Sequence, residues 1–384
     1  MPRRGRTSEP RDAPAARLVE PLAAWFASAK RDLPWRDLPP GKRDPYRTLV
    51  SEAMLQQTQV SRVVEKFRAF IERFPTVEAL AAADERDVMA RWAGLGYYRR
   101  ARNLHAAARH VVERCGGTFP SEVEGLLELP GVGRYTAGAI ASLAMGRPAP
   151  IVDGNVARVM LRVQGRDLDQ QAPATTAWAW RQAEAFASAA GPLAGAANEA
   201  MMELGATVCT PGPAPACGAC PLATCCEAKR LGLQARIPRP KKAKAPAKRW
   251  MAVLVIRDPK GRLLCERRGA EGLWAGLHQP VTLEPEEGAE RVRAWLAAPT
   301  GACRGVRFAR AAAIARQLTH RSLTVEVHEA TVTAAAATRL TRGAIGPPGG
   351  QGTGLERRWM TPAALRAAGM SKAHEAALLA ANAG

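Results

Sequence analysis

The sequence has 384 residues, a hydrophobic content of 47% and a formal net charge of +20 at pH 7. This length favours two or three domains over a single core, and no apolar run is long enough to span a bilayer as a helix. The basic excess indicates a polyanionic partner, most commonly nucleic acid, although a codon bias toward Arg and Ala would raise the charge in the same direction.

Residues 1–16 are basic and contain no apolar stretch, so we expect a disordered arm rather than a secretory signal. The expected location is therefore the cytoplasm, with the nucleoid of a bacterium as the place of action. Residues 17–230 have apolar side chains at helical spacing, and no strand pattern interrupts them. Residues 44–74 predict one helical run, and residues 134–146 predict an alanine-rich helix that ends at Gly146.

The stretch ELPGVGRYTAG, residues 128–138, predicts a tight turn between two helices. Ser121 and Glu124, just before it, have the spacing of a capping box. Because Gly131 and Gly133 lack a Cβ atom, the backbone N–H groups there could approach a phosphate directly, and Arg134 adds a positive charge. A plain turn between helices would explain the same glycines.

Five of the eight cysteines fall within one short segment, at Cys209, Cys217, Cys220, Cys225 and Cys226. A Cys-x-x-Cys core with flanking cysteines in a loop rich in proline and glycine can surround an inorganic centre with four thiolates. Both a [4Fe–4S] cluster and a structural zinc ion accept four thiolates. Chemistry alone does not decide between Cys225 and Cys226 as the fourth ligand.

Residues 231–249 combine basic residues with prolines, which predicts an extended linker. The sequence after this linker changes to an α+β pattern. Residues 250–268 predict two strands joined by a Pro-Gly turn, and residues 322–333 predict a strand with one buried face. Residues 288–298 and 371–384 predict helices.

Taken together, these motifs resemble the helix–hairpin–helix DNA glycosylases that carry an iron–sulfur cluster, and most closely the MutY-type adenine glycosylases. The resemblance rests on the hairpin, on the cysteine run and on four further stretches: LPWR (33–36), SEAMLQQTQV (51–60), GLGYYRRARNLH (94–105) and PIVDGNVARVM (150–160). It implies an all-α glycosylase core with a cluster loop over residues 17–230, and a C-terminal α+β Nudix-like domain over residues 250–384. The core would consist of a six-helix part (about 45–150) and a cluster part (about 17–44 and 151–230).

The resemblance implies removal of adenine mispaired with 8-oxoguanine or guanine, with Glu52 as the general acid and Asp153 stabilising the sugar cation. Burial of Glu52 at the edge of an apolar helix face would raise its pKa. Asp153 should also cap the helix that follows, where Asn155 helps to hold the site. Tyr135 occupies the position of the lysine of the related endonuclease III-type enzymes, and a phenol cannot form a Schiff base. A monofunctional glycosylase is therefore expected.

The resemblance also assigns binding residues. The adenine pocket would be lined by Trp35, Arg36, Leu55 and Glu199. The contacts to DNA would come from Gln57, Tyr97, Gly131, Gly133 and Arg134. The partner base, 8-oxoguanine, would be read by Leu318, Thr319 and His320. The cluster would be held by Cys209, Cys217, Cys220 and Cys226, with the family spacing selecting Cys226.

The C-terminal domain lacks the acidic run with which Nudix hydrolases hold magnesium, so it should recognise the lesion rather than hydrolyse a diphosphate. The expected partner is double-stranded DNA with A:8-oxoguanine or A:G mispairs, bound by a monomer and without a membrane. Two alternatives stay open. One is an endonuclease III-like enzyme acting on oxidised pyrimidines, and the other is a DNA-binding protein that scans without catalysis.

Overall fold

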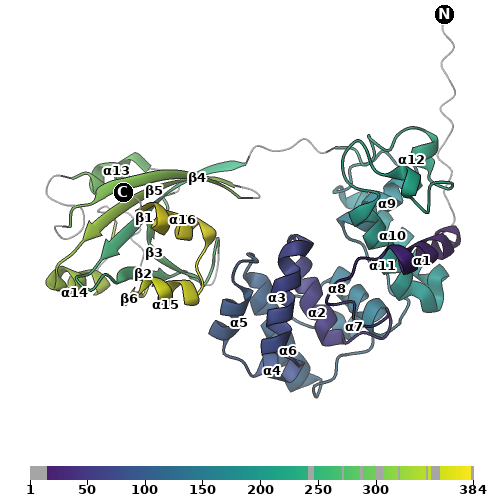
Figure 1. Cartoon of the computed structure of the whole chain (residues 1–384), viewed down its shortest axis with the longest axis horizontal. Coiled ribbons are helices and arrows are strands. Elements are labelled where there is room, and N and C mark those ends of the chain that lie inside the picture. Colours follow the sequence, from purple (N-terminus) through teal and green to yellow (C-terminus); the bar gives the residue numbers. More distant parts are fainter. Residues whose placement is uncertain are drawn as a thin grey trace, which may run out of the picture. The chain divides into compact units, whose positions relative to one another are not determined.

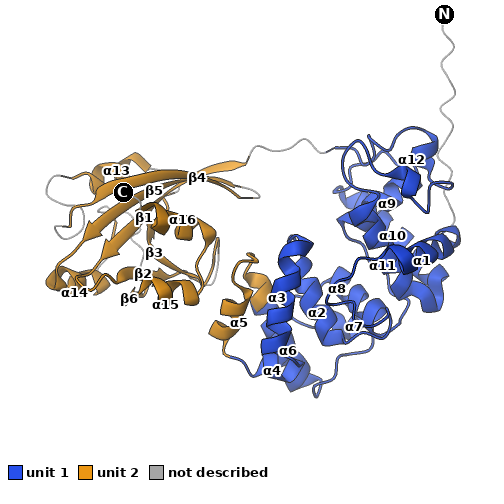
Figure 2. Cartoon of the chain, viewed as in Figure 1, with its two compact units in different colours: residues 1–83, 102–242 blue, residues 84–101, 243–384 orange. Residues whose placement is uncertain are grey.

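In a computed structural model of the chain, the structure describes residues 15–240, 246–269, 272–285, 289–298, 306–318, 321–342, 345–346 and 355–381. The chain forms two compact units, one of residues 1–83 with 102–242 and one of residues 84–101 with 243–384 (Figure 2). The sequence predicts a single domain over 17–230, whereas the structure groups residues 84–101 with the C-terminal unit. Of the expected basic arm, residues 1–14 lie outside the described residues. Among the helices that the structure describes, none is long and apolar enough to cross a membrane.

The helical unit has a core formed by helices from both ends of its sequence (Figure 1). Helix α1 (Ala16–Ala29) packs against α10 (Pro173–Ala190) and α11 (Ala194–Thr207). Phe26 and Phe186 are buried in this core, together with the apolar side of α9 (Gly154–Val163). Segments distant in the sequence therefore enclose the same apolar interior.

Two helices replace the single run predicted over residues 44–74. Helix α2 (Pro45–Leu55) begins at Asp44, whose carboxylate accepts a hydrogen bond from the backbone N–H of Tyr46 at 2.8 Å. The chain then leaves the helix at Gln57, which has a φ of +55°. Helix α3 (Val60–Arg73) follows. A left-handed residue cannot continue a right-handed helix, so the prediction of one unbroken helix is wrong at this turn.

Two short helices and one long helix follow, and a side chain caps each of the two short ones. They are α4 (Val77–Ala81), α5 (Glu85–Trp92) and α6 (Arg99–Arg114). The side chain of Thr76 accepts from a backbone N–H at the start of α4, and that of Asp84 does so at the start of α5. Such side-chain caps satisfy N–H groups that have no partner inside the helix.

The predicted helix–turn–helix consists of α7 (Val123–Leu127) and α8 (Arg134–Ala139) (Figure 1). Gly131 has a φ of +76°, and a Cβ atom there would lie 2.4 Å from the Asn103 Cβ atom, so this position requires glycine. The capping box is wrong: α7 is capped by the backbone of Glu122 without a side-chain hydrogen bond, and the Ser121 hydroxyl donates to Glu122 instead.

Helix α8 continues into a π-helical turn, η1 (Ile140–Ala144). The helical region then ends at Gly146, which has a φ of +69° and confirms the predicted end. After α11 come two short helices around the cysteine loop, η3 (Cys217–Ala219) and α12 (Glu227–Arg230). A further short turn, η2 (Gly191–Leu193), joins α10 to α11.

Part of the segment predicted as a linker over residues 231–249 is packed against the helical unit. Ile237 is buried in a small apolar cluster with Leu161, and the backbone N–H of Arg239 donates to the carbonyl of Leu168 at 2.9 Å. Strand β1 begins at Ala247. The prolines disfavour regular structure there, while Leu233 and Ile237 pack against the helical unit.

The C-terminal unit contains a six-stranded mixed sheet in the order β4-β5-β1-β3-β2-β6. Its strands are β1 (Ala247–Arg257), β2 (Leu263–Arg267), β3 (His278–Leu283), β4 (Ala309–Gln317), β5 (Arg321–Thr331) and β6 (Arg357–Met360). Strands β1 and β5 are parallel, whereas the other pairs are antiparallel. The edge pair β4–β5 contains a bulge between Arg310 and Ala312.

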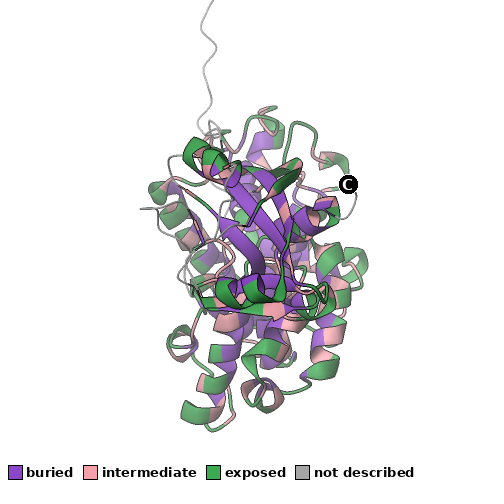
Figure 3. Ribbon diagram, turned by 90° about the vertical axis from the view of Figure 1, so that its left-hand side faces the viewer, coloured by how far each residue is buried: buried purple, intermediate pink, exposed green. Residues whose placement is uncertain are grey.

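Helices cover both faces of this sheet. Helices α13 (Ala289–Leu296) and α14 (Ala334–Arg342) pack on the face with Leu254, and α15 (Pro362–Ala367) and α16 (Lys372–Ala381) pack on the face with Val253. The central strands are therefore buried on both sides (Figure 3). The strand expected at 322–333 is present as β5, but the prediction of a single buried face is wrong because Glu326 and His328 are also buried.

Replacing Gly138 by alanine should destabilise the helical unit, because the added Cβ atom would lie 2.1 Å from the carbonyl oxygen of Pro150. Overpacking of this kind costs about 1–3 kcal/mol. Differential scanning calorimetry should show a lower melting temperature for the transition of the helical unit. Gly218→Ala is the matched control, because no atom lies within 4 Å of its added Cβ. Equal effects of the two substitutions would contradict the close approach.

Candidate active site and cysteine loop

Glu52 lies on α2 with its carboxyl group removed from solvent, since only 6% of the residue is exposed. The hydroxyl of Tyr135, from α8, donates a hydrogen bond to Glu52 Oε2 at 2.7 Å and also lies 3.5 Å from Met202 Sδ. Burial raises the pKa of Glu52 to about 7; the Tyr135 hydrogen bond opposes this rise, and the charge of Asp153 adds to it. A carboxyl with this pKa is about half protonated near neutral pH and can act as an acid.

Asp153 is the N-cap of α9, as predicted. Its Oδ1 accepts from the backbone N–H of Val156 at 2.7 Å, and its Oδ2 accepts from Asn155 Nδ2 at 3.1 Å. Burial nevertheless raises the pKa of Asp153, because the loss of solvent outweighs these hydrogen bonds and the nearby charge of Arg158. The capping bonds thus limit this rise, and the negative form is held by oriented donors.

Arg158 connects this cap to the cysteine loop. Its Nη2 donates to Asn155 Oδ1 at 2.8 Å and to the carbonyl of Gly205 at 2.8 Å, and its Nε donates to the carbonyl of Cys209 at 2.9 Å. Gly205 permits this packing, because a Cβ atom there would lie 2.5 Å from the Asn155 Cβ atom. The orientation of Asn155 therefore depends on α11 and on the start of the cysteine loop.

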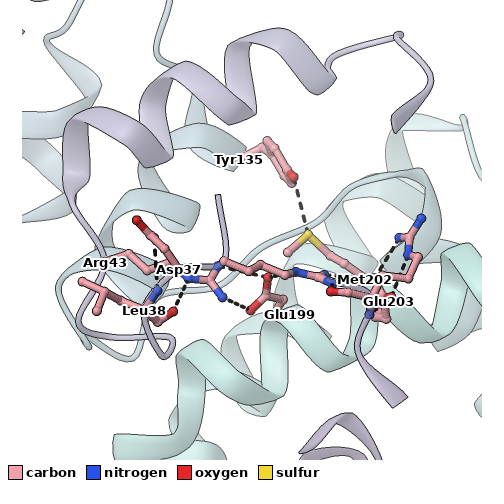
Figure 4. Close-up of polar contacts among 9 residues, drawn as sticks. Asp37, Leu38, Arg43, Tyr135, Glu199, Met202 and Glu203 are labelled. Carbon is pink, nitrogen blue, oxygen red and sulfur yellow. Dashed lines mark hydrogen bonds and ion pairs between the residues drawn. The ribbon is translucent and has the colours of Figure 1, made fainter. Parts of the chain in front are cut away.

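A buried ion network fixes the LPWR segment to α11 (Figure 4). Arg36 Nε donates to Glu199 Oε1 at 2.7 Å, and its Nη2 donates to Glu203 Oε2 at 2.9 Å. Arg31 also donates to Glu203, and these arginine bonds lower the pKa of Glu203 to about 2 although burial alone would raise it. Arg43 donates to both oxygens of Glu199, with Nη1 at 3.0 Å and Nη2 at 2.7 Å.

The other two residues predicted for the base pocket are Trp35 and Leu55. Trp35 is buried, and its ring meets that of Phe67 edge to face with 5.5 Å between centroids. Leu55 is the last residue of α2 and is half-buried. The structure thus brings Arg36 and Glu199 into direct contact, while the aromatic ring of Trp35 is held by the core.

Gln57 and Tyr97, the predicted wedge residues, share an unusual backbone. Both have a positive φ, +55° and +48° respectively, and both side chains are exposed. The Arg100 guanidinium lies 5.3 Å from the Tyr97 ring centroid and 5.4 Å from that of Trp92. A left-handed non-glycine residue is strained, so each turn is maintained by its surroundings rather than by local preference.

In the hairpin, Gly133 is the N-cap of α8 and has no atom within 4 Å of where its Cβ would be, so the backbone there is open. Gly131 is exposed at the turn. Arg134, which was predicted to face DNA, is engaged with α10 in this structure. It pairs with Glu184, and its guanidinium lies 4.0 Å from the centroid of the Trp180 ring.

The four cysteines predicted as ligands line one hollow, together with Arg162 and Lys229. Arg162 Nη1 donates to Cys209 Sγ at 3.4 Å. Burial raises the pKa of Cys220 to about 11, and the neighbouring thiols of Cys209 and Cys226 add to the rise, which places these groups close together. Thiols with raised pKa values ionise only beside a positive charge. The four cysteines therefore suit a metal centre, which binds sulfur as thiolate and supplies that charge.

Cys225 is not part of this hollow. Its Sγ donates to the carbonyl of Leu222 at 3.4 Å, and its side chain packs against the core of the helical unit. In the part of the chain that the structure describes, no three His, Cys, Asp or Glu side chains are placed to hold one metal ion. The four cysteines thus surround a space without converging on a single point.

In the C-terminal unit, Leu318 follows β4 and is half-buried, and its backbone N–H donates to the carbonyl of Arg321 at 2.8 Å. Thr319 and His320, the other residues predicted to read the partner base, lie outside the described residues. The structure therefore places only the first residue of this predicted set, at the start of the turn between β4 and β5.

Sequence reasoning did not single out Arg43, Glu203, Arg158 or Arg162. The spacing of charged residues along α9 and α11 could have indicated three of them. Glu199 and Glu203 lie four residues apart on an otherwise apolar helix, and so do Arg158 and Arg162. Residues four apart share one face of a helix, so paired charges on a buried helix predict buried partners.

Comparison with known proteins places these features in two families. Residues 50–184 match the HhH-GPD superfamily of base excision DNA repair proteins, and residues 252–380 match the NUDIX domain. Among solved structures, a thermostable thymine-DNA glycosylase is similar, with a TM-score of 0.50 and 27% identity over 56% of this chain and 97% of that chain.

Curated relatives are named adenine DNA glycosylases. The protein from Homo sapiens is 37% identical over 321 residues, which are 70% of this chain and 58% of the relative. The protein from Mycolicibacterium smegmatis is 45% identical over 206 residues, which are 53% of this chain and 67% of the relative. The chain thus spans 58% of the length of the human relative that it matches.

Glu52→Gln should stabilise the chain relative to wild type as the pH rises. In the folded protein the pKa of Glu52 is raised from 4.5 to about 7, so the stability that this carboxyl contributes is present below pH 4.5 and is lost as the pH rises through 7. Glutamine does not ionise. The difference in free energy of unfolding between variant and wild type should therefore grow by about 3 kcal/mol across this window.

Urea unfolding followed by the helical circular dichroism signal, at several pH values across that window, measures this difference. Glu72→Gln, at an exposed position on α3, is the control and should show no such trend. A difference between Glu52→Gln and wild type that is independent of pH would mean that Glu52 is not buried with a raised pKa.

Proposed function

The chain belongs to the MutY-type adenine DNA glycosylase family, and we propose on this premise that it removes adenine from DNA by hydrolysing the N-glycosidic bond. The observation that carries the proposal is the buried Glu52 carboxyl, with its pKa raised to about 7 and its hydrogen bond from Tyr135. A protonated carboxyl facing a substrate can give its proton to a ring nitrogen of adenine, which then leaves as a neutral base.

As the base departs, the deoxyribose develops positive charge at C1′. Asp153 provides the negative charge that stabilises it, because its oxygens are fixed by Val156 and Asn155 at the N-cap of α9. Water then bonds to C1′ where the base was attached, and one proton of that water restores Glu52. The products are free adenine and an abasic site in an intact strand.

Tyr135 supports a monofunctional enzyme. Its hydroxyl is committed to Glu52 and is no amine, so it cannot attack C1′ to form a Schiff base. Burial raises the pKa of Tyr135 well above its ordinary value, so its hydroxyl stays protonated and donates a hydrogen bond to Glu52. The role of Tyr135 is then to orient the acid.

The DNA contacts follow from the exposed turns. The open backbone at Gly133 would approach a phosphate, with Gly131 shaping the turn before it, and Gln57 with Tyr97 would fill the stack from which adenine is extruded. Trp35, Arg36, Leu55 and Glu199 would line the pocket for the extruded base. The Nudix-like unit would read 8-oxoguanine or guanine in the opposite strand through residues 318–320.

Cys209, Cys217, Cys220 and Cys226 would hold a [4Fe–4S] cluster. A zinc ion draws four sulfurs to within about 2.3 Å of one point, whereas a cluster binds each thiolate to a different iron atom and occupies a larger space. The four cysteines around one hollow would supply the four thiolates, and the family resemblance favours the cluster over zinc. The group would act here as a structural centre of the loop.

The proposed activity predicts base release without strand cleavage. A duplex with adenine opposite 8-oxoguanine is incubated under single-turnover conditions, and each time point is divided and run with and without hot alkali. Breaks at adenine should appear only after alkali. Breaks without alkali would mean a lyase, as in endonuclease III-type enzymes, and binding without any breaks would favour a scanning protein.

In the same assay, Glu52→Gln should slow base release by a factor of about 100 to 10,000 while leaving duplex binding intact, because the proton donor is lost. Glu72→Gln should cleave like wild type. Base release by Glu52→Gln at the wild-type rate would remove Glu52 from the role of acid.

Cys226→Ser should lower the iron and sulfide content of the purified chain, whereas Cys225→Ser should retain both, because Cys226 lines the hollow and Cys225 does not. Metal and sulfide analysis of the two variants measures this difference. Zinc in place of iron, or iron loss in Cys225→Ser alone, would contradict the proposed ligand set.

A further inference from the structure

The loop between α1 and α2 contributes a charged residue to the active site that no motif singled out. Arg43 is buried, with 7% exposed, and all three of its nitrogens are engaged. Its Nε donates to the carbonyl of Leu38 at 2.9 Å, and its two Nη atoms donate to the two oxygens of Glu199 at 3.0 and 2.7 Å. Figure 4 shows Arg43 directed at Glu199 from this loop.

This pairing differs from that of Arg36. Arg36 divides its guanidinium between Glu199, Glu203 and the carbonyl of Arg31. Arg43 meets Glu199 with two parallel N–H groups, the arrangement that fixes a carboxylate in orientation as well as in position. Arg43 is therefore the side chain that holds both oxygens of Glu199, while Arg36 holds Oε1 alone.

Glu52 is surrounded by charged and titratable groups from four segments. Tyr135 comes from α8, Asp153 from the cap of α9, Glu199 from α11 and Arg43 from the loop before α2. Asp153 and Glu199 place negative charge toward Glu52, and Arg43 is the cation among these four groups. In a buried site such charges are poorly screened, so the balance between them acts on any proton held there.

We propose that Arg43 is a positioning residue that holds the carboxylate of Glu199 and offsets its negative charge beside Glu52. The proposal rests on the proposed function, in which Glu52 is the acid and Glu199 lines the base pocket. Arg43 does not touch the substrate in this scheme. It acts through Glu199, by orientation, and on Glu52, by charge.

The two partners of this pair can be separated by the sign of their effects. Arg43→Met removes a positive charge near Glu52 and should move the titration midpoint of Glu52 to higher pH. Glu199→Gln removes a negative charge and should move it to lower pH. Glu199 acts on Glu52 more strongly than Arg43 does, so the shift in Glu199→Gln should be the larger of the two, up to about tenfold in proton affinity, which is one pKa unit. The double variant should return close to wild type.

A purely structural pair would behave differently, because either substitution breaks it in the same way. The titration is measured on the full chain labelled with ¹³C at the glutamate carboxyl, with the Glu52 signal assigned by its loss in Glu52→Gln. Arg147→Met and Glu122→Gln, which break an exposed pair with 2.8 Å between Nη2 and Oε1, are the matched controls and should leave the Glu52 midpoint unchanged. Shifts of the same sign in Arg43→Met and Glu199→Gln, or none, would overturn the proposal.

Arg43→Lys separates charge from orientation, because lysine keeps the positive charge but cannot pair in the two-pronged way. It should restore the Glu52 midpoint while base release stays slower than in wild type. If Arg43→Met does not fold, the downward shift in Glu199→Gln and the unchanged midpoint in Arg43→Lys decide the matter. The titration needs no DNA, so absence of adenine release by the wild type would refute the proposed function without touching the charge balance.

Discussion

An ionised side chain that leaves water must find partners inside the protein, and this requirement organises the helical unit. The carboxylates of Glu199 and Glu203 are buried on α11, and the arginines that satisfy them come from the loop between α1 and α2. That loop has no regular secondary structure, so its course follows from where the two carboxylates lie. The same loop leads into α2, which carries Glu52.

Glu52 is the exception to this pairing. Its carboxyl accepts a hydrogen bond from the neutral hydroxyl of Tyr135, and no arginine forms an ion pair with it in the part of the chain that the structure describes. The two kinds of buried carboxyl therefore behave in opposite ways. Arginines lower the pKa of Glu203 to about 2, whereas burial raises the pKa of Glu52 to about 7. Glu203 on α11 therefore keeps a permanent negative charge, whereas Glu52 on α2 can exchange a proton near neutral pH, and the difference comes from their partners.

Much of this arrangement could be predicted from local sequence. The strands at 250–268, the end of the helix at Gly146 and the cap at Asp153 depend on residues close together in the chain, and each is present. The break after α2 was missed because Gln57 has no local preference for its left-handed backbone. The role of Arg43 was missed for a related reason: its partner is distant in sequence, and an arginine in a loop normally indicates a solvated surface.

The local sequence pattern also could not predict that both faces of the sheet are buried. The alternation in β5 predicts one apolar and one polar face, and the polar face is buried because α13 and α14 cover it. Glu326 is then satisfied by Arg293 from α13, whose Nε and Nη2 donate at 2.9 and 2.7 Å. The sequence of a strand shows its own periodicity, but the helices packed against the sheet determine which side meets water.

Strand β4 is an edge strand of the sheet and is exposed along most of its length. A free strand edge offers unpaired N–H and C=O groups, to which a second chain could add a strand of its own. Here the edge contains the bulge between Arg310 and Ala312, and it carries a further arginine at Arg316. Two such edges brought together would set like charges side by side across an irregular backbone. The bulge that interrupts the pairing of β4 with β5 is therefore also a barrier to the growth of the sheet from one molecule into the next.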